Sequence, residues 1–242
     1  GAAVTPLTII CTLWKGWQPI YDFRHVNALG SMLDRHMPGV RFVCFTDDPA
    51  GIRYETAPLP PVPRLPMNGK RNCYRRLWYF SKECAAQFPG YLMNIDLDCL
   101  VLDTLWPVLE GNDFHILRAS VCPYNGGFWT HRTGTMPRVW NALTPIALRK
   151  MYRDRYARRW VGSDQRWLAY MLPGEPTYGE EHGIVYGHGP IKYPLTHEGE
   201  TERLMAESRV LFFPGPPGVK PWSSNAARFA PLIHETYMEY FE

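Results

Sequence analysis

Two continuous apolar segments near the start of the chain limit the fold more than any other feature. Residues 7–13 (LTIICTL) and 41–46 (RFVCFT) are rich in β-branched and aromatic side chains and lack the alternation of a half-exposed strand. Such segments are typical of strands buried on both faces of a parallel sheet. Residues 21–36, between them, have apolar side chains at helical spacing and are followed by the stop signal Pro38-Gly39. This order predicts a right-handed crossover and an α/β fold with a mostly parallel sheet flanked by helices.

Length and composition agree with one folded domain. The 242 residues are 45% hydrophobic and 14% aromatic, which excludes a disordered chain, so residues 1–242 are expected to form a single domain. The formal net charge of +3 gives no general argument for a nucleic acid or a membrane as partner. No apolar run approaches the roughly 20 residues that span a bilayer. The six cysteines contain no C-x-x-C pair, so we expect buried reduced thiols and a cytoplasmic protein.

Further strands and helices are expected along the rest of the chain. Strands are predicted at residues 91–95, 114–118, 127–130 and 209–213, and helices at residues 73–88, 137–160 and 164–172. Pro145 is expected to interrupt the second of these helices. The remainder after residue 172 is rich in Gly and Pro, and only the strand at 209–213 is expected there.

The strongest chemical signal is the segment YLMNIDLDCLVLDTL at residues 91–105. Asp96 and Asp98 follow its apolar strand directly. Because α/β sheets bind ligands at the carboxyl ends of their strands, both carboxylates can reach one cation there. Carboxylate oxygens select hard cations, so Asp96 and Asp98 are predicted to hold Mn²⁺ or Mg²⁺, which as a Lewis acid offsets the charge of a diphosphate. The next acid, Asp103, is expected to cap a following helical turn.

The chain resembles GT-A glycosyltransferases, especially the glycogenin-like retaining family and its small bacterial and phage relatives. Similar segments occur in family order over nearly the whole chain: IICTLW, FTDDP, NCYRRLWYF, the Asp-x-Asp motif, PYNGGFW, GSDQRWLAYML and FFPGPPGVKPW. The resemblance implies a GT-A-like fold with a nucleotide-binding part at about residues 1–105 and an acceptor-side part at about residues 106–242. It implies a hexosyl- or pentosyltransferase that uses a nucleotide-sugar donor, expected to be UDP-linked, with retention of configuration.

The same resemblance assigns roles to individual residues. Asp164 and Gln165 are expected near the anomeric centre as the catalytic pair. The residues expected to bind the donor are Thr12, Arg76, Asp96, Asn125, Gly126 and Lys220. Plainer explanations stay open: Arg76 and Lys220 as solvated side chains, Asn125-Gly126 as part of a turn, and Asp164 as a helix N-cap.

One segment departs from the family pattern. Relatives usually have a His near the end that completes the metal site, whereas Phe212, Phe213 and Pro214 stand there. Either water or another residue closes the site, and His188 is the nearest candidate, although a single loop His is usually not a ligand.

Two other function classes fit parts of the sequence. A nucleotidyltransferase also uses acid-held Mg²⁺ on a doubly wound sheet, but residues 14–17 (WKGW) are not the Gly-rich phosphate loop of that class. A non-catalytic sugar-nucleotide-binding protein is the other alternative. No general base is identified.

The acceptor is open between a saccharide, a protein and an anionic acceptor such as modified DNA. Residues 149–159 (RKMYRDRYARR) contain six basic residues and one acidic residue. On a helix, Arg149 and Arg153 fall near one face, four residues apart. Together with Arg155 and Arg158 they either form a solvated face or attract an anionic acceptor.

Overall fold

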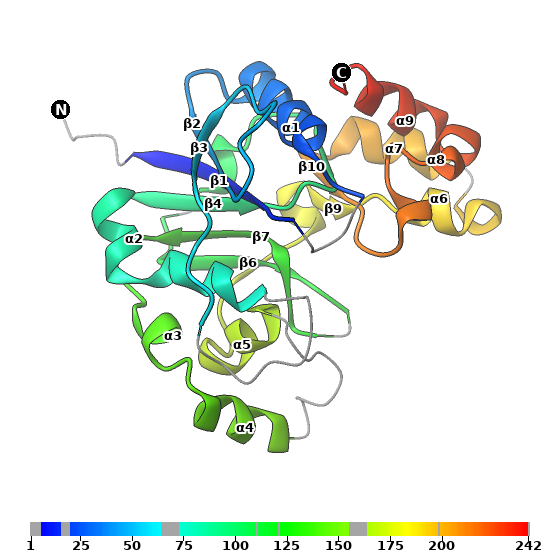
Figure 1. The fold of residues 1–242 in the computed structure, drawn as a ribbon. Coiled ribbons are helices and arrows are strands. Elements are labelled where there is room, and N and C mark those ends of the chain that lie inside the picture. The colour runs from blue at the N-terminus through cyan, green and yellow to red at the C-terminus, as the bar shows by residue number, and fades with distance from the viewer. Residues whose placement is uncertain are drawn as a thin grey trace.

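A seven-stranded sheet forms the centre of the molecule, as Figure 1 shows. The computed structural model describes residues 6–15, 20–63, 73–109, 111–120, 122–154, 164–197 and 199–241. From one edge to the other, the strands are β3 (Glu55–Pro58), β2 (Arg41–Thr46), β1 (Leu7–Leu13), β4 (Tyr91–Ile95), β7 (Tyr124–Arg132), β6 (Phe114–Arg118) and β8 (Thr177–Tyr178). Only β7 runs antiparallel to its neighbours, and the other adjacent pairs are parallel. The predicted mostly parallel α/β sheet is confirmed.

Both faces of the sheet are covered, which explains why the first strands are apolar throughout. Along β1, Ile9 and Cys11 join one hydrophobic core, whereas Ile10 joins the other. The first core lies under α1 (Phe23–His36), α7 (Glu200–Glu207), α8 (Ser224–Phe229) and α9 (Pro231–Met238). The second lies under the 3₁₀ helix η1 (Cys73–Phe80), α2 (Lys82–Gln87), α3 (Arg138–Asn141), α4 (Pro145–Arg153) and α5 (Asp164–Met171). In Figure 1, α1 and α7–α9 lie above the sheet, and α3–α5 lie below it.

A second, three-stranded sheet brings the C-terminal part of the chain to the Asp-x-Asp motif. It consists of β5 (Cys99–Val101), β10 (Val210–Phe212) and β9 (Ile184–Tyr186), with β10 in the middle. β10 runs antiparallel to β5 and parallel to β9. Because β5 begins one residue after Asp98, the pairing continues into the motif: the Phe213 N–H donates to the Asp98 carbonyl at 2.9 Å.

Several predicted elements differ from those observed. The helix predicted at residues 73–88 is two helices, because Ser81 ends η1 and caps α2 by accepting from the Cys84 N–H at 3.0 Å. The interruption predicted at Pro145 is confirmed, since α4 begins there, but residues 155–160 lie outside the described part of the chain. The strand predicted at residues 127–130 is longer and runs over all of β7.

The expectation of a single element after residue 172 is wrong. Besides β8, β9, β10 and α7–α9, this part contains α6 (Gly189–Lys192) and the short 3₁₀ helices η3 (Glu180–His182), η4 (Pro194–Thr196) and η5 (Pro217–Val219). The cap predicted for Asp103 is also wrong. The next helical turn, η2 (Trp106–Val108), has Leu105 as its N-cap, and Asp103 instead accepts from Arg209 at 2.6 Å.

The expectations of buried, reduced cysteines and of no membrane-spanning segment can be compared with the structure. All six cysteines are buried and free of disulfides, as predicted. In the described ranges, no helix combines the length and the apolar character needed to cross a membrane.

Candidate active site

A cavity of about 620 Å³ opens at the carboxyl ends of β1 and β4, where the sequence predicts ligand binding. Its lining includes residues from β1, η1, β7, α5 and the segment after β10, which are far apart in the chain. The predicted site residues that line it are Thr12, Arg76, Asp96, Asp98, Asn125, Gln165 and Lys220. The structure therefore brings most of the predicted site together.

Arg76 lies between two carboxylates at the floor of this site. Its Nη1 donates to Asp96 Oδ1 at 2.5 Å, and its Nε donates to Asp164 Oδ2 at 2.8 Å. Burial lowers the pKa of the guanidinium, but the charges of Asp164 and Asp96 outweigh this and hold the pKa well above its ordinary value. Arg76 is therefore a fixed positive charge and not a solvated surface arginine.

Asp164, the first residue of α5, is 3% exposed and does not line the cavity. Burial raises the pKa of its carboxyl, and the Arg76 charge only partly offsets that effect. Because its carboxylate is bound to Arg76, Asp164 is placed to orient that side chain.

Lys220 makes the second ion pair of the site. Its Nζ donates to Asp98 Oδ2 at 2.5 Å and to the Phe213 carbonyl at 2.7 Å, and the residue is 1% exposed. Tyr21, which sequence reasoning missed, donates its hydroxyl to the same Asp98 oxygen at 3.2 Å. Burial raises the pKa of Asp98, and the Lys220 charge opposes this rise.

Two glycines let the backbone of β7 approach these charged groups. A Cβ at Gly126 would lie 3.1 Å from Arg76 Nη2, and a Cβ at Gly127 would lie 3.1 Å from Asp96 Oδ2. Asn125 Oδ1 accepts from the Gly127 N–H at 2.8 Å, but the segment lies within β7, where the pairing with β6 shifts register, and so it is not the simple turn that the sequence left open. Asn125 lines the cavity, so its position is compatible with the predicted binding role.

The side chains of Gln165 and Thr12 lie at the cavity, and each forms a hydrogen bond with another residue. Gln165 Oε1 accepts from the Gly126 N–H at 3.1 Å, and among the described residues its amide NH₂ group has no partner, so it can donate to a ligand. The Thr12 hydroxyl is 2.7 Å from the Tyr79 hydroxyl. Sequence reasoning missed Lys192, an exposed lysine of α6 that also lines the cavity. No sequence motif identifies Lys192 or Tyr21 as site residues, because only the tertiary structure brings them to the cavity.

The two acids of the motif differ in what they can offer a metal ion. The Asp96 side chain is 36% exposed, and among the described residues its Oδ2 has no hydrogen-bonding partner, whereas Asp98 is already paired with Lys220. Within that part of the chain, no group of three or more His, Cys, Asp or Glu side chains is placed to hold a metal. Two carboxylates nevertheless suit Mg²⁺ or Mn²⁺, which complete their shell with phosphate oxygens and water. His188 does not line the cavity, whereas Pro214 does.

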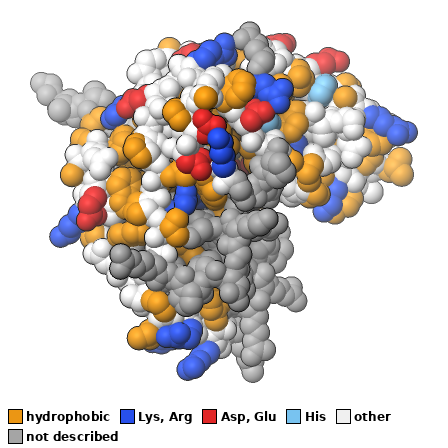
Figure 2. All heavy atoms as spheres, viewed as in Figure 1, with side chains coloured by type: hydrophobic (Ala, Val, Ile, Leu, Met, Phe, Trp, Pro, Cys, Tyr) orange, Lys and Arg blue, Asp and Glu red, His pale blue; other side chains and the backbone are white. Residues whose placement is uncertain are grey.

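The basic segment predicted on the acceptor side does not reach the cavity. Arg149 and Arg153 are exposed on α4, and no residue of α4 lines the cavity. Figure 2 shows Lys and Arg side chains gathered at the lower end of the molecule, over α4. Neither arginine forms an ion pair with another described residue, while Arg155 and Arg158 lie outside the described part. An acceptor role for this helix stays a prediction.

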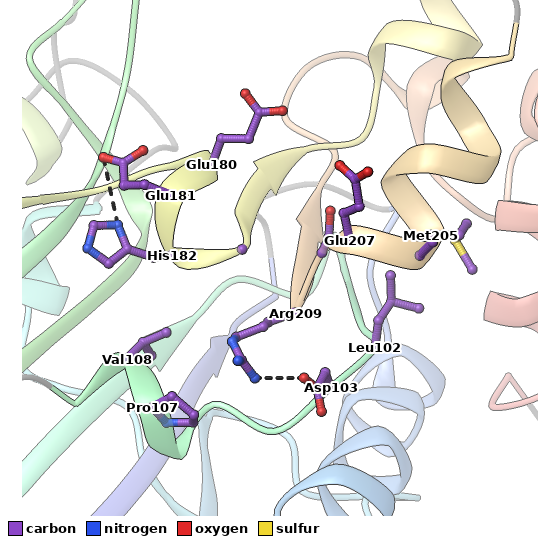
Figure 3. A pocket seen from close by; sticks show the side chains of 13 residues that line it. Leu102, Asp103, Pro107, Val108, Glu180, Glu181, His182, Met205, Glu207 and Arg209 are labelled. Atoms are coloured by element: carbon purple, nitrogen blue, oxygen red, sulfur yellow. Dashed lines mark hydrogen bonds and ion pairs between the residues drawn. The ribbon is translucent and has the colours of Figure 1, made fainter.

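A second cavity, of about 530 Å³, lies beside the small sheet (Figure 3). Glu180, Glu181 and Glu207 line it, and its only basic lining side chains, Arg209 and His182, face an acid each. None of the predicted site residues lies there. The first cavity is therefore the candidate active site.

Comparison with known proteins gives a structural match and no sequence match. No protein-family model and no curated protein matches the chain. Among solved structures, the glycosyltransferase GlyE of Streptococcus pneumoniae TIGR4 has a TM-score of 0.59 at 13% identity, over 97% of this chain and 61% of that one. The chain thus spans less than two thirds of that protein.

Other glycosyltransferases match with similar quality. The galactosyltransferase LgtC, solved with donor and acceptor sugar analogues, has a TM-score of 0.57 at 14% identity, over 96% of this chain and 95% of that one. A glycosyltransferase involved in glycosylation of the major capsid of PBCV-1 has a TM-score of 0.53 at 12% identity, over 96% and 99%. The expected fold is confirmed: the chain has the GT-A fold of these glycosyltransferases.

Proposed function

We propose that this chain is a glycosyltransferase that transfers a sugar from a nucleotide-sugar donor, UDP-linked, with Mn²⁺ or Mg²⁺ and with retention of configuration. The observation that supports it best is the convergence of Asp96, Asp98, Arg76 and Lys220 on one cavity at the strand ends of a GT-A fold. Fixed positive groups beside two carboxylates suit a ligand that carries both a diphosphate and a divalent cation.

The positive side chains would act on the leaving group. Negative charge develops on the diphosphate as the bond between its oxygen and the anomeric carbon breaks. Arg76 is held rigidly by Asp164 and Asp96, so its charge needs no reorganisation during the reaction. Lys220 provides a second charge at the same cavity. Asp96 and Asp98 would hold the divalent ion, which supplies Lewis-acid neutralisation of the same diphosphate.

The sugar would lie against Asn125, Gly126 and Gln165. The amide NH₂ of Gln165 can donate to a sugar oxygen, and Asn125 lines the same cavity. In a retaining front-side displacement, the acceptor oxygen attacks the face from which the diphosphate departs, and a phosphate oxygen takes the acceptor proton. This chemistry fits a site without an evident carboxylate nucleophile, since Asp164 is bound to Arg76.

A donor-hydrolysis assay with and without Mn²⁺ tests the proposal against its two rivals. A thermal-shift panel of UDP-linked and GDP-linked sugars with Mn²⁺ first selects the donor. A glycosyltransferase releases free sugar and nucleoside diphosphate from that donor in a Mn²⁺-dependent manner. A nucleotidyltransferase instead forms a sugar nucleotide from a nucleoside triphosphate and a sugar phosphate, and a binding protein turns over neither. NMR of the first-formed anomer decides between retention and inversion.

A further inference from the structure

Lys220 is a buried cation whose position depends on Asp98. Its ammonium group contacts the Asp98 carboxylate and the Phe213 carbonyl, and the whole residue is 1% exposed. A buried ammonium group is costly unless a carboxylate compensates it, and the converse holds for the buried carboxylate. Each therefore stabilises the other, and Tyr21 adds a neutral donor to the same oxygen, Asp98 Oδ2.

The other acid of the motif is arranged differently. Asp96 is paired with Arg76 through Oδ1 only, and its side chain is 36% exposed. Arg76 does not depend on Asp96, because Asp164 holds it from the opposite side. Asp96 therefore has an oxygen available to an incoming cation, whereas Asp98 Oδ2 is already occupied by a cation that belongs to the protein.

We propose that Lys220 and the divalent cation compete for Asp98, so that cation binding releases Lys220 toward the diphosphate. This inference rests on the proposed function. Two cations held by one carboxylate repel each other, so Lys220 and a divalent cation at Asp98 each weaken the binding of the other. Lys220 lines the donor cavity, so its released ammonium group would stay at the wall where the diphosphate binds.

The competition has a thermodynamic consequence. The cation alone would bind weakly, because it must displace a built-in counterion. With the diphosphate present, the released Lys220 gains a new anionic partner, so cation and diphosphate would strengthen each other's binding by the same factor. Lys220 would thereby keep the empty site charge-balanced and also favour joint binding of cation and donor.

The test is a calorimetric titration of MnCl₂ into the wild type and Lys220→Met, first without nucleotide. Methionine keeps an unbranched apolar side chain and removes the charge. We expect Lys220→Met to bind Mn²⁺ alone about ten-fold more tightly, the size expected for loss of a charge-assisted competitor. In the presence of Mn²⁺, the variant should bind UDP about ten-fold more weakly than the wild type. Lys192→Met removes the other lysine that lines the cavity, which forms no ion pair with a carboxylate of the described residues, and should change Mn²⁺ affinity only slightly.

Two further measurements place the effect at Asp98. The double variant Asp98→Asn, Lys220→Met should lose the gain in Mn²⁺ affinity. In the wild type, Mg²⁺ should raise the labelling of Lys220 by an amine-reactive reagent, measured by mass spectrometry with Lys192 as the internal reference. The labelling experiment uses only the wild type, so it still tests the inference if Lys220→Met fails to fold.

The outcomes separate this inference from the proposed function. Equal or weaker Mn²⁺ binding by folded Lys220→Met, with normal Mn²⁺-dependent turnover by the wild type, overturns the competition and leaves the proposed function intact. Mg²⁺ binding that leaves Lys220 labelling unchanged also overturns it. No Mn²⁺ binding by either protein, with or without UDP, overturns both.

Discussion

Replacing Arg76 should destabilise the protein because it leaves Asp164 buried without its cation. Asp164 is 3% exposed, whereas the Asp96 side chain is 36% exposed and stays partly hydrated, so the cost comes mainly from Asp164. Removing one partner of a buried ion pair typically costs about 3–5 kcal/mol. Since only one of the two acids is fully buried, we expect about 3 kcal/mol for Arg76→Met. For a domain of this size, that corresponds to a fall in Tm of roughly 6–12 °C.

The pH dependence gives this prediction its sharper test. The folded-state pKa of Asp164 is already raised by burial, and loss of Arg76 raises it further, because the Arg76 charge lowers it in the wild type. A carboxyl with a raised folded-state pKa gives its stabilising contribution at low pH and loses it as the pH rises through that pKa. The Tm difference between wild type and Arg76→Met should therefore be largest near neutral pH and shrink toward the unfolded-state pKa of about 3.9.

The control is the neighbouring Arg75, whose guanidinium lies 5.3 Å from the centre of the Trp14 ring. Arg75→Met removes the same charge from the same 3₁₀ helix, and no ion pair joins Arg75 to an acid in the described part of the chain. It should cost about 1 kcal/mol or less. Thermal melts between pH 4 and 8 on the three proteins measure all of this. A Tm of Arg76→Met equal to that of Arg75→Met, or a Tm difference that does not change with pH, would refute the reasoning.

Three other predictions concern function. Asp98→Asn should abolish Mn²⁺-dependent donor hydrolysis while keeping hydrogen bonds to Lys220, and full hydrolysis by this variant in the presence of chelator would exclude Asp98 from a metal site. Gly126→Ala should weaken binding of the sugar nucleotide, because its Cβ would lie 3.1 Å from Arg76 Nη2, and unchanged calorimetric affinity would contradict this. Arg149→Ala with Arg153→Ala should weaken any salt-sensitive binding to DNA, RNA or anionic vesicles while UDP binding persists. If a titration at low ionic strength shows no anionic binding in the wild type, α4 is only a solvated face.

The central strands could be predicted because their sequence pattern has one physical cause. A strand covered on both faces needs apolar side chains at successive positions, and β1, β2 and β4 all show this. β3 was missed because it lies at the edge of the sheet, where its four residues are exposed or only partly buried. An edge strand of this kind lacks the apolar run on which the prediction depended.

The C-terminal helices were missed because proline was taken only as a breaker. In α6 and α9, proline occupies the first turn, where the missing N–H has no intrahelical partner in any case. The side chain of Ser223 caps α8 by accepting from the Ala226 N–H at 3.1 Å. Both signals are present in the sequence and could have identified these helices.

The predicted site residues were found by type, but their pairing could not be inferred from local sequence. Lys220 was predicted to bind the donor, whereas its partner in the structure is Asp98, 122 residues away in the chain. Asp98 is buried although it stands at the end of a strand, because the segment after β10 covers it. Both facts depend on which strand pairs with β5.

The register of the small sheet therefore determines the electrostatics of the active site. Phe212 stands opposite Cys99, and the next pair of residues places the Phe213 N–H on the Asp98 carbonyl. The Phe213 carbonyl in turn accepts from Lys220, so the position of the lysine follows from that of the strand. A slip of β10 by two residues would keep its side chains on the same faces but would move it by about 6–7 Å along β5. Lys220 would then lose contact with Asp98. A buried carboxylate and a buried ammonium group would both be left without an ionic partner, which is costly, so this ion pair favours the observed register.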